Sequence, residues 1–168
     1  MRVYLPCTLP ALARAVAAGE LGPGPLTGYA VTPALIEWYA SGDTEELEYV
    51  ALTEAARASL RMLADDRADG RAVVGRRVVI AAEVTDDAVR GGAELEERAR
   101  VRVCGPIPLA HVASVHIDDV SATPDIEAAI DALPGADRDD DDARFTVDGA
   151  EANELMWYAT QEIPDLLT

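Results

Sequence analysis

The stretch from Arg77 to Val84 constrains the fold of this chain more than any other segment. Its residues are apolar almost without interruption after the arginine at its start. A strand with this pattern, which lacks the alternation of a half-exposed strand, is buried on both faces of a sheet. Helices must then cover the sheet on both sides, and this requirement predicts a layered α/β fold.

The rest of the chain supplies further strands and helices in alternation. Short apolar or alternating runs predict the other strands at residues 2–5, 29–31, 98–103, 115–117 and 144–147. Helix-capping residues and threonine–proline starts predict helices at residues 8–18, 32–40, 43–65, 123–133 and 148–158. We expect a mixed sheet of five or six strands with at least one antiparallel pair, formed by 98–103 and the apolar strand before it.

Length and composition indicate a single domain over residues 1–168. The chain is 49% apolar, which is enough to build a core without a disulfide or a metal ion. The aspartate-rich segment 134–143 predicts a mobile acidic loop. Because no apolar run has the length of a signal or membrane segment, we expect a cytoplasmic protein whose cysteines, Cys7 and Cys104, are reduced.

The charge of the chain excludes several classes of function. It has 31 acidic side chains against 14 basic ones, for a net charge of −17. Such a field repels nucleic acids and anionic membranes, so we expect neither as a partner. Every basic residue is an arginine. Without lysine there is no Schiff-base chemistry, no P-loop lysine and no kinase lysine, and we expect no cofactor.

Cys7 is the first candidate for chemistry, because it stands between the end of a predicted strand and the start of a predicted helix. Helix N-termini lower the pKa of a thiol and favour the nucleophilic thiolate. A catalytic thiolate also needs a base, for which His111 and His116 are candidates. The pattern allows a cysteine-dependent enzyme that uses Cys7 with a histidine or carboxylate partner. The alternative is that Cys7 is a small apolar residue at a tight turn.

A zinc site is a second possibility for the same histidines. Their spacing falls in the range found in zinc fingers, and Cys104 precedes them. The pair of cysteines at short spacing that such sites need is absent. One solvent-facing and one hydrogen-bonded histidine is the simpler interpretation.

Aspartates late in the chain could bind a divalent cation. Asp137, Asp139 and Asp141 belong to this run. An EF-hand loop that starts at Asp137 would need glycine and glutamate where the chain has Asp142 and Asp148. Crowded carboxylates also repel one another, which favours a solvated loop. A cation-binding protein is therefore our second alternative function.

Two surfaces could bind a partner. Arg98, Arg100 and Arg102 share one face of an alternating strand, where they could receive a carboxylate, a phosphate or an acidic partner, or form a solvated face. Trp157 and Tyr158 end the last predicted helix, where they could anchor an interface or pack in the core. Our leading interpretation is a non-catalytic intracellular domain that binds a protein or a small ligand.

Four stretches resemble a protein family of unknown function from actinobacteria, whose members have about this length. They are Met1–Thr8, Gly28–Leu35, Trp38–Glu48 and Trp157–Ile163. The resemblance extends over most of the chain and is densest in the first third and at the end. It implies a single cytoplasmic domain and adds no mechanism.

Overall fold

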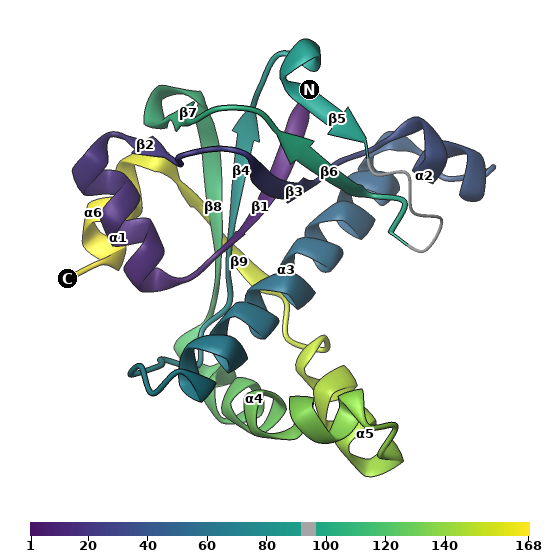
Figure 1. Cartoon of the computed structure of the whole chain (residues 1–168), viewed down its shortest axis with the longest axis vertical. Coiled ribbons are helices and arrows are strands. Elements are labelled where there is room, and N and C mark those ends of the chain that lie inside the picture. The colour runs from purple at the N-terminus through teal and green to yellow at the C-terminus, as the bar shows by residue number, and fades with distance from the viewer. Residues whose placement is uncertain (92–96) are drawn as a thin grey trace.

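A seven-stranded sheet forms the centre of the computed structural model, which describes residues 1–91 and 97–168 (Figure 1). In sheet order its strands are β5 (Val89–Gly91), β6 (Arg100–Val103), β3 (Leu26–Tyr29), β1 (Arg2–Cys7), β4 (Val78–Glu83), β8 (Val112–Asp118) and β9 (Leu155–Ala159). A small second sheet pairs β2 (Glu20–Leu21) with β7 (Ile107–Pro108). All pairings between described strands are antiparallel. The predicted α/β class is confirmed, with more strands than the expected five or six.

The first three helices begin directly after the capping residues predicted from the sequence, Thr8, Thr32 and Asp43. The helices are α1 (Leu9–Ala18), α2 (Pro33–Trp38), α3 (Thr44–Ala68), α4 (Thr123–Asp137), α5 (Asp141–Ala150) and α6 (Ile163–Leu166), with short 3-10 turns η1 (Asp86–Ala88), η2 (Leu109–His111), η3 (Val120–Ala122) and η4 (Thr160–Glu162). The hydroxyls of Thr8 and Thr32 accept hydrogen bonds from backbone N–H groups at the starts of α1 and α2. Asp43 and Glu46 form the predicted capping box of α3. Among the described residues, no helix combines the length and apolarity that crossing a bilayer requires.

The two faces of the sheet pack against different helices. On one face, Val79 and Ala81 of β4 lie against Ala51 and Ala55 of α3, whose small side chains let the helix approach closely. On the other face, alternate residues of the same strands join α1 and α6 in a second cluster. Strand β4 is buried from Val78 to Ala82, which confirms the central strand expected from its apolar run.

The C-terminal quarter differs from the sequence prediction. Residues 148–158 were expected to form a helix, but Leu155–Ala159 is strand β9, which pairs with β8. Residues 144–147 were expected to form a strand, but they lie inside α5. The helix starts earlier because Asp140 is its cap, and its carboxylate accepts from two backbone N–H groups.

Two further expectations are also corrected. Segment 134–143 contains the last turn of α4, a three-residue connection over 138–140 and the start of α5, so helices occupy most of the expected acidic loop. The alternating strand 98–103, described as β6, pairs with β3 and β5 and not with β4. It cannot pair with β4, because β1 and β8 occupy both edges of that strand. The pair of helices α4 and α5 packs at the end of α3 that lies far from α2 (Figure 1).

Candidate functional site

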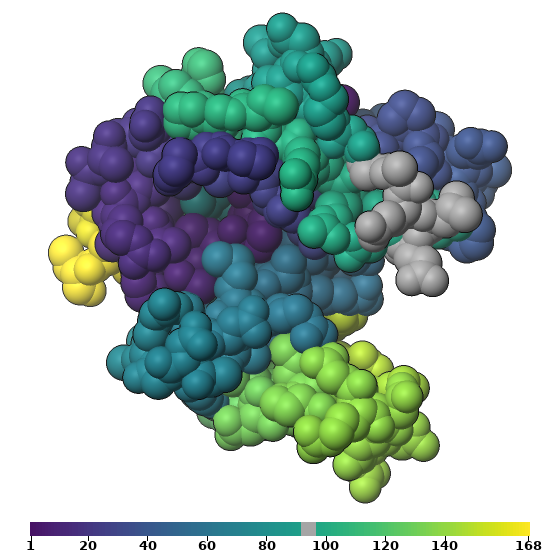
Figure 2. All heavy atoms as spheres, in the orientation of Figure 1, coloured from purple at the N-terminus to yellow at the C-terminus, as the bar shows by residue number. Residues whose placement is uncertain are grey.

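Cys7 borders a cavity between α1 and the sheet, which we call the Cys7 cavity. Its volume is about 350 Å³. Figure 2 shows the hollow, bordered by α1, the segment that carries β2 and β3, and α3. The side chains of Leu5, Cys7 and Ile80 line it from the sheet, and all three are buried. Met62 of α3 and Leu21 of β2 add to an apolar lining.

Helix α1 forms one wall of the Cys7 cavity. The helix residues that line it recur at helical spacing: Ala11, Arg14, Ala15 and Ala18. Arg14 is the only charged residue of α1, and it makes no hydrogen bond or ion pair with any described residue. The opposite charge at this cavity is Glu20 of β2, which likewise has no partner among the described residues.

The loop after β2 encloses the cavity from a further side. Gly22 lines the cavity, and its φ of +150° favours glycine. A Cβ atom on Gly24 would lie 2.5 Å from the backbone nitrogen of Gly105, so only glycine permits this close approach. The proline- and glycine-rich segment therefore depends on its glycines both for its backbone conformation beside the cavity and for its contact with Gly105.

The Cys7 thiol is neutral at physiological pH. Burial raises its pKa from 9.0 to about 11 and outweighs the opposing effects of the Thr8 backbone and the Arg14 guanidinium. Its Sγ donates to the Thr8 carbonyl oxygen at 3.3 Å. A position at a helix start can lower the pKa of a thiol and favour the thiolate, but at Cys7 desolvation has the larger effect and raises the pKa. In this state the side chain is an apolar wall of the cavity.

The structure does not bring the predicted histidine partners to Cys7. His116 lies opposite Val79 in the sheet, so it shares the α3 face, whereas Cys7 points to the α1 face. The His116 ring packs edge-on against Tyr4 with 6.5 Å between the ring centroids, and burial lowers its pKa. His111 is exposed in η2. Neither histidine has a described contact with the thiol.

A larger cavity lies on the other side of Met62, and we call it the charged cleft. Its volume is about 540 Å³, and it is bordered by β3, β6, α3 and α5. Its arginines bind carboxylates of the same chain. Arg57 bonds Glu54 at 2.8 Å and Glu151 at 3.0 Å, and the Glu151 hydrogen bond raises the pKa of Arg57. Arg61 bonds both oxygens of Asp137, which lies beyond the cleft, at 2.9 and 3.0 Å.

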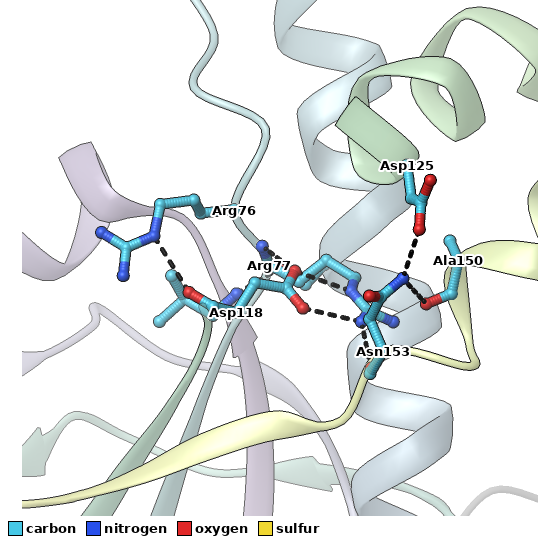
Figure 3. Close-up of polar contacts among 8 residues, drawn as sticks. Arg76, Arg77, Asp118, Asp125, Ala150 and Asn153 are labelled. Atoms are coloured by element: carbon cyan, nitrogen blue, oxygen red, sulfur yellow. Dashed lines mark hydrogen bonds and ion pairs between the residues drawn. The ribbon is translucent and has the colours of Figure 1, made fainter. Parts of the chain in front are cut away.

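A buried ion pair lies at the back of the charged cleft. Arg77 donates to both carboxylate oxygens of Asp118 at 2.8 and 2.9 Å, and its backbone N–H adds a bond of 2.7 Å (Figure 3). Arg77 also donates to the carbonyl of Asn153, whose amide reaches Asp125. The network ties β4 and β8 to the segment before β9. The sequence did not lead us to predict this ion pair. The available signal was that Arg77 directly precedes one apolar strand and Asp118 ends another.

Ser59 connects α3 to the two strands beneath it. Its hydroxyl donates to the carbonyl of Cys7 at 2.7 Å and accepts from the N–H of Val78 at 3.0 Å. The residue is fully buried. A serine inside the alanine-rich face of α3 therefore fixes the backbone at the end of β1, next to the Cys7 cavity.

The predicted arginine stripe is divided among separate contacts. Arg98 stacks over the ring of Trp38, 3.7 Å from its centroid. Arg100 forms an ion pair with Glu97, and Arg102 is exposed. The opposite side chains of the strand are buried, as the alternation predicted. The three guanidinium groups therefore have different environments, and their joint role in binding an anion stays a prediction.

The candidate metal ligands are engaged or dispersed. Asp137 bonds Arg61, which lowers its pKa, and Asp139 pairs with Arg144. Asp141 is exposed in the first turn of α5. Across residues 1–91 and 97–168, no three acidic, histidine or cysteine side chains gather as a metal site would require.

The aromatic pair near the C-terminus lies on an edge strand and not on the expected helix. Trp157 is 60% exposed on β9, and Met156 beside it is also exposed. Tyr158 points to the opposite side and packs against the cluster that contains α1 and α6. The last strand in the sheet thus presents an apolar surface at its edge.

The chain was compared with known protein families, curated proteins and solved structures. The model of a family of unknown function, DUF6912, matches residues 1–167. No curated protein and no solved structure matches the chain.

Proposed function

Since the chain belongs to DUF6912, a family of unknown function, we propose a function from its own geometry: it binds a small ligand with an apolar body in the Cys7 cavity, without catalysis. The observation that carries the proposal is a largely apolar cavity of about 350 Å³ whose mouth holds two charges without a partner among the described residues. Small-ligand sites have volumes of about 300–1,000 Å³, mostly apolar linings and a few polar groups.

The state of Cys7 supports binding over covalent catalysis. A thiol with a pKa of about 11 is almost entirely protonated at pH 7, and the thiolate is the nucleophile. Among the described contacts, neither a histidine nor a carboxylate hydrogen-bonds the thiol, whose printed partner is the Thr8 carbonyl, so no base is positioned to take the proton. The thiol therefore contributes an apolar contact to the ligand.

A cavity-filling variant tests the proposed site. Ala15→Leu extends a side chain from α1 into the cavity, whereas Ala13→Leu adds the same atoms on the exposed side of the helix. Ligand-observed NMR with indole and cyclohexanol measures binding of apolar bodies. We expect binding to the parent protein and to the Ala13→Leu variant, and loss of binding in the Ala15→Leu variant. Equal binding to the Ala13→Leu and Ala15→Leu variants would disprove the site.

The exposed edge of β9 favours a second function, self-association. We propose that β9 pairs with the same strand of a second copy of the chain. An edge strand offers unpaired backbone groups, and antiparallel pairing of identical strands satisfies a two-fold axis. Residues 155–161 carry no charge in a chain of net charge −17, so the strand itself adds no like-charge repulsion between two copies. Trp157 and Met156 supply apolar contacts on its two faces.

Sedimentation velocity tests this self-association. The Trp157→Glu variant places a carboxylate at the proposed contact, and Trp38→Glu changes the other tryptophan, which is equally exposed at 61%. We expect dimers in the parent protein and in the Trp38→Glu variant, and monomers in the Trp157→Glu variant. A monomeric parent protein at all concentrations would end the proposal.

Our proposal also includes the cellular setting. We infer a cytoplasmic protein of actinobacterial origin that acts as one domain, with no nucleic-acid partner. The net charge of −17 and the exclusive use of arginine support this inference. Strands from both ends of the chain join one sheet, which supports the single domain. Retention in the soluble fraction at low salt, without nucleic acid, is the expected observation.

A further inference from the structure

The mouth of the Cys7 cavity carries two opposite charges that the fold leaves unsatisfied. Arg14 and Glu20 both line the cavity and both are exposed, but they do not pair with each other or with another described residue. Most other arginines do bind a carboxylate, including Arg57 and Arg61 in the neighbouring cleft. The unpaired state of the two groups at one cavity therefore calls for an explanation.

Arg14 is exposed to water, and it is also the one charged residue of α1 that lines the cavity. Amphipathic helices place charged residues on the side that faces water. On α1 the exposed positions away from the cavity are uncharged, as at Ala13 and Ala17, and the single charge of the helix lines the cavity. Arg14 shares its face with Ala11 and Ala18, whose small side chains leave the guanidinium accessible at the mouth.

We propose that the ligand of the Cys7 cavity is a zwitterion, an α-amino acid with a large aliphatic side chain. This inference rests on the proposed binding function and specifies its ligand. Arg14 binds the carboxylate, and Glu20 binds the ammonium group. The aliphatic side chain lies against Leu5, Cys7 and Ile80, which are apolar and buried.

Both charges are needed to select this class. An aliphatic carboxylate would bind Arg14 but would be repelled by Glu20. An aliphatic amine would bind Glu20 but would be repelled by Arg14. The field of the whole chain also opposes an anion, because the net charge is −17. A zwitterion has no net charge, so it approaches without long-range repulsion and then satisfies both groups.

Titration calorimetry with three compounds that share the 3-methylbutyl group tests the proposal. They are L-leucine, 4-methylpentanoate, which lacks the amine, and 3-methylbutylamine, which lacks the carboxylate. We expect each analogue to bind at least about tenfold more weakly than leucine, because each loses one charge-assisted hydrogen-bonding group. The Arg14→Gln and Glu20→Gln variants should each weaken leucine binding by a similar factor. Arg102→Gln, which changes another exposed arginine for which the structure describes no partner, should not weaken it.

Failure of this inference can be told apart from failure of the binding function. If either analogue binds as tightly as leucine, or if the two charge variants retain full leucine binding, the zwitterion is disproved. The zwitterion is also disproved if indole and cyclohexanol bind the parent protein and not the Ala15→Leu variant, whereas leucine does not bind the parent protein. If none of the five compounds binds, the ligand-binding function itself is disproved. Circular dichroism of each variant confirms that it is folded.

Discussion

The Cys7 cavity and the charged cleft share Pro6, Thr27 and Met62, but their charges are arranged in opposite ways. In the charged cleft, Arg57 and Arg61 bind carboxylates of the same chain. In the Cys7 cavity the charges at the mouth have no described partners, and the deeper lining is apolar.

This difference shows that volume is a poor guide to the binding site. The charged cleft is the larger of the two, but an anionic ligand there would have to displace the carboxylates that already bind Arg57 and Arg61. A ligand of the Cys7 cavity gains contacts that the fold itself does not make. We therefore infer that the charged cleft is a structural joint between α3 and α5, and that the smaller cavity is the site.

The largest expected effect is at the buried ion pair behind the charged cleft. We expect Asp118→Ala to destabilise the protein by about 3–5 kcal/mol, because it leaves the buried Arg77 guanidinium without a counter-charge. Urea unfolding followed by circular dichroism measures the change in unfolding free energy. If the cleft is structural, this variant loses stability while its folded fraction retains the Cys7 cavity.

Arg76→Ala is the matched control for that change. Arg76 is adjacent in sequence and donates to the backbone carbonyl of Asp118 at 3.0 Å, but it is only half-buried. Its removal leaves no buried charge, so we expect a much smaller loss of stability. Similar losses of unfolding free energy in both variants would show that burial is not the reason why the Arg77–Asp118 pair stabilises the protein.

Local signals were enough to predict much of the fold. Thr8, Thr32 and Asp43 cap helices as expected, because capping depends on residues within one turn. Strand β9 could not be found in this way, because its partner β8 lies about forty residues earlier and supplies the hydrogen bonds that decide its state. Asp148 and Glu151 have the spacing of a capping box and led us to predict a helix start there, whereas the cap of α5 is Asp140.

The candidate site was predictable only in part. The place of Cys7 between a strand and a helix followed from the sequence, but the closure that buries it depends on residues 20–27 folding across α1. The sequence also shows that Arg14 is alone in an alanine-rich helix, but not that a cavity lies beside it. The Arg77–Asp118 pair joins residues 41 positions apart, which no local pattern reveals.

The next largest expected effect is a pH-dependent loss of stability at Cys7, which lines the Cys7 cavity. The Cys7 pKa is raised from 9.0 to about 11 on folding, so the unfolded chain releases the thiol proton first. Stability from this group is complete below pH 9 and is lost as the pH rises from 9 towards 11. A pKa shift of this size corresponds to roughly 2–3 kcal/mol of unfolding free energy. Unfolding free energies measured across this range, in a Cys104→Ser background, should show the decline.

Cys7→Ala in the same background isolates the contribution of the thiol. Burial also raises the pKa values of Tyr4 and Tyr29, and both contribute a decline of the same sign. Their contributions are common to both proteins and cancel in the difference. If the two proteins lose stability in parallel from pH 9 to 11, the thiol is not buried as the structure describes.

The smallest effect should come from the paired charges of the charged cleft. Arg57 bonds Glu54 and Glu151, but its side chain is half-exposed, and exposed ion pairs contribute at most about 1 kcal/mol. We expect Arg57→Ala to lower the unfolding free energy by less than that, with leucine binding unchanged. The control Arg102→Ala removes an exposed arginine without a described partner and should change neither quantity. Weaker leucine binding in the Arg57→Ala variant alone would assign the ligand to the charged cleft and reverse the comparison of the two cavities.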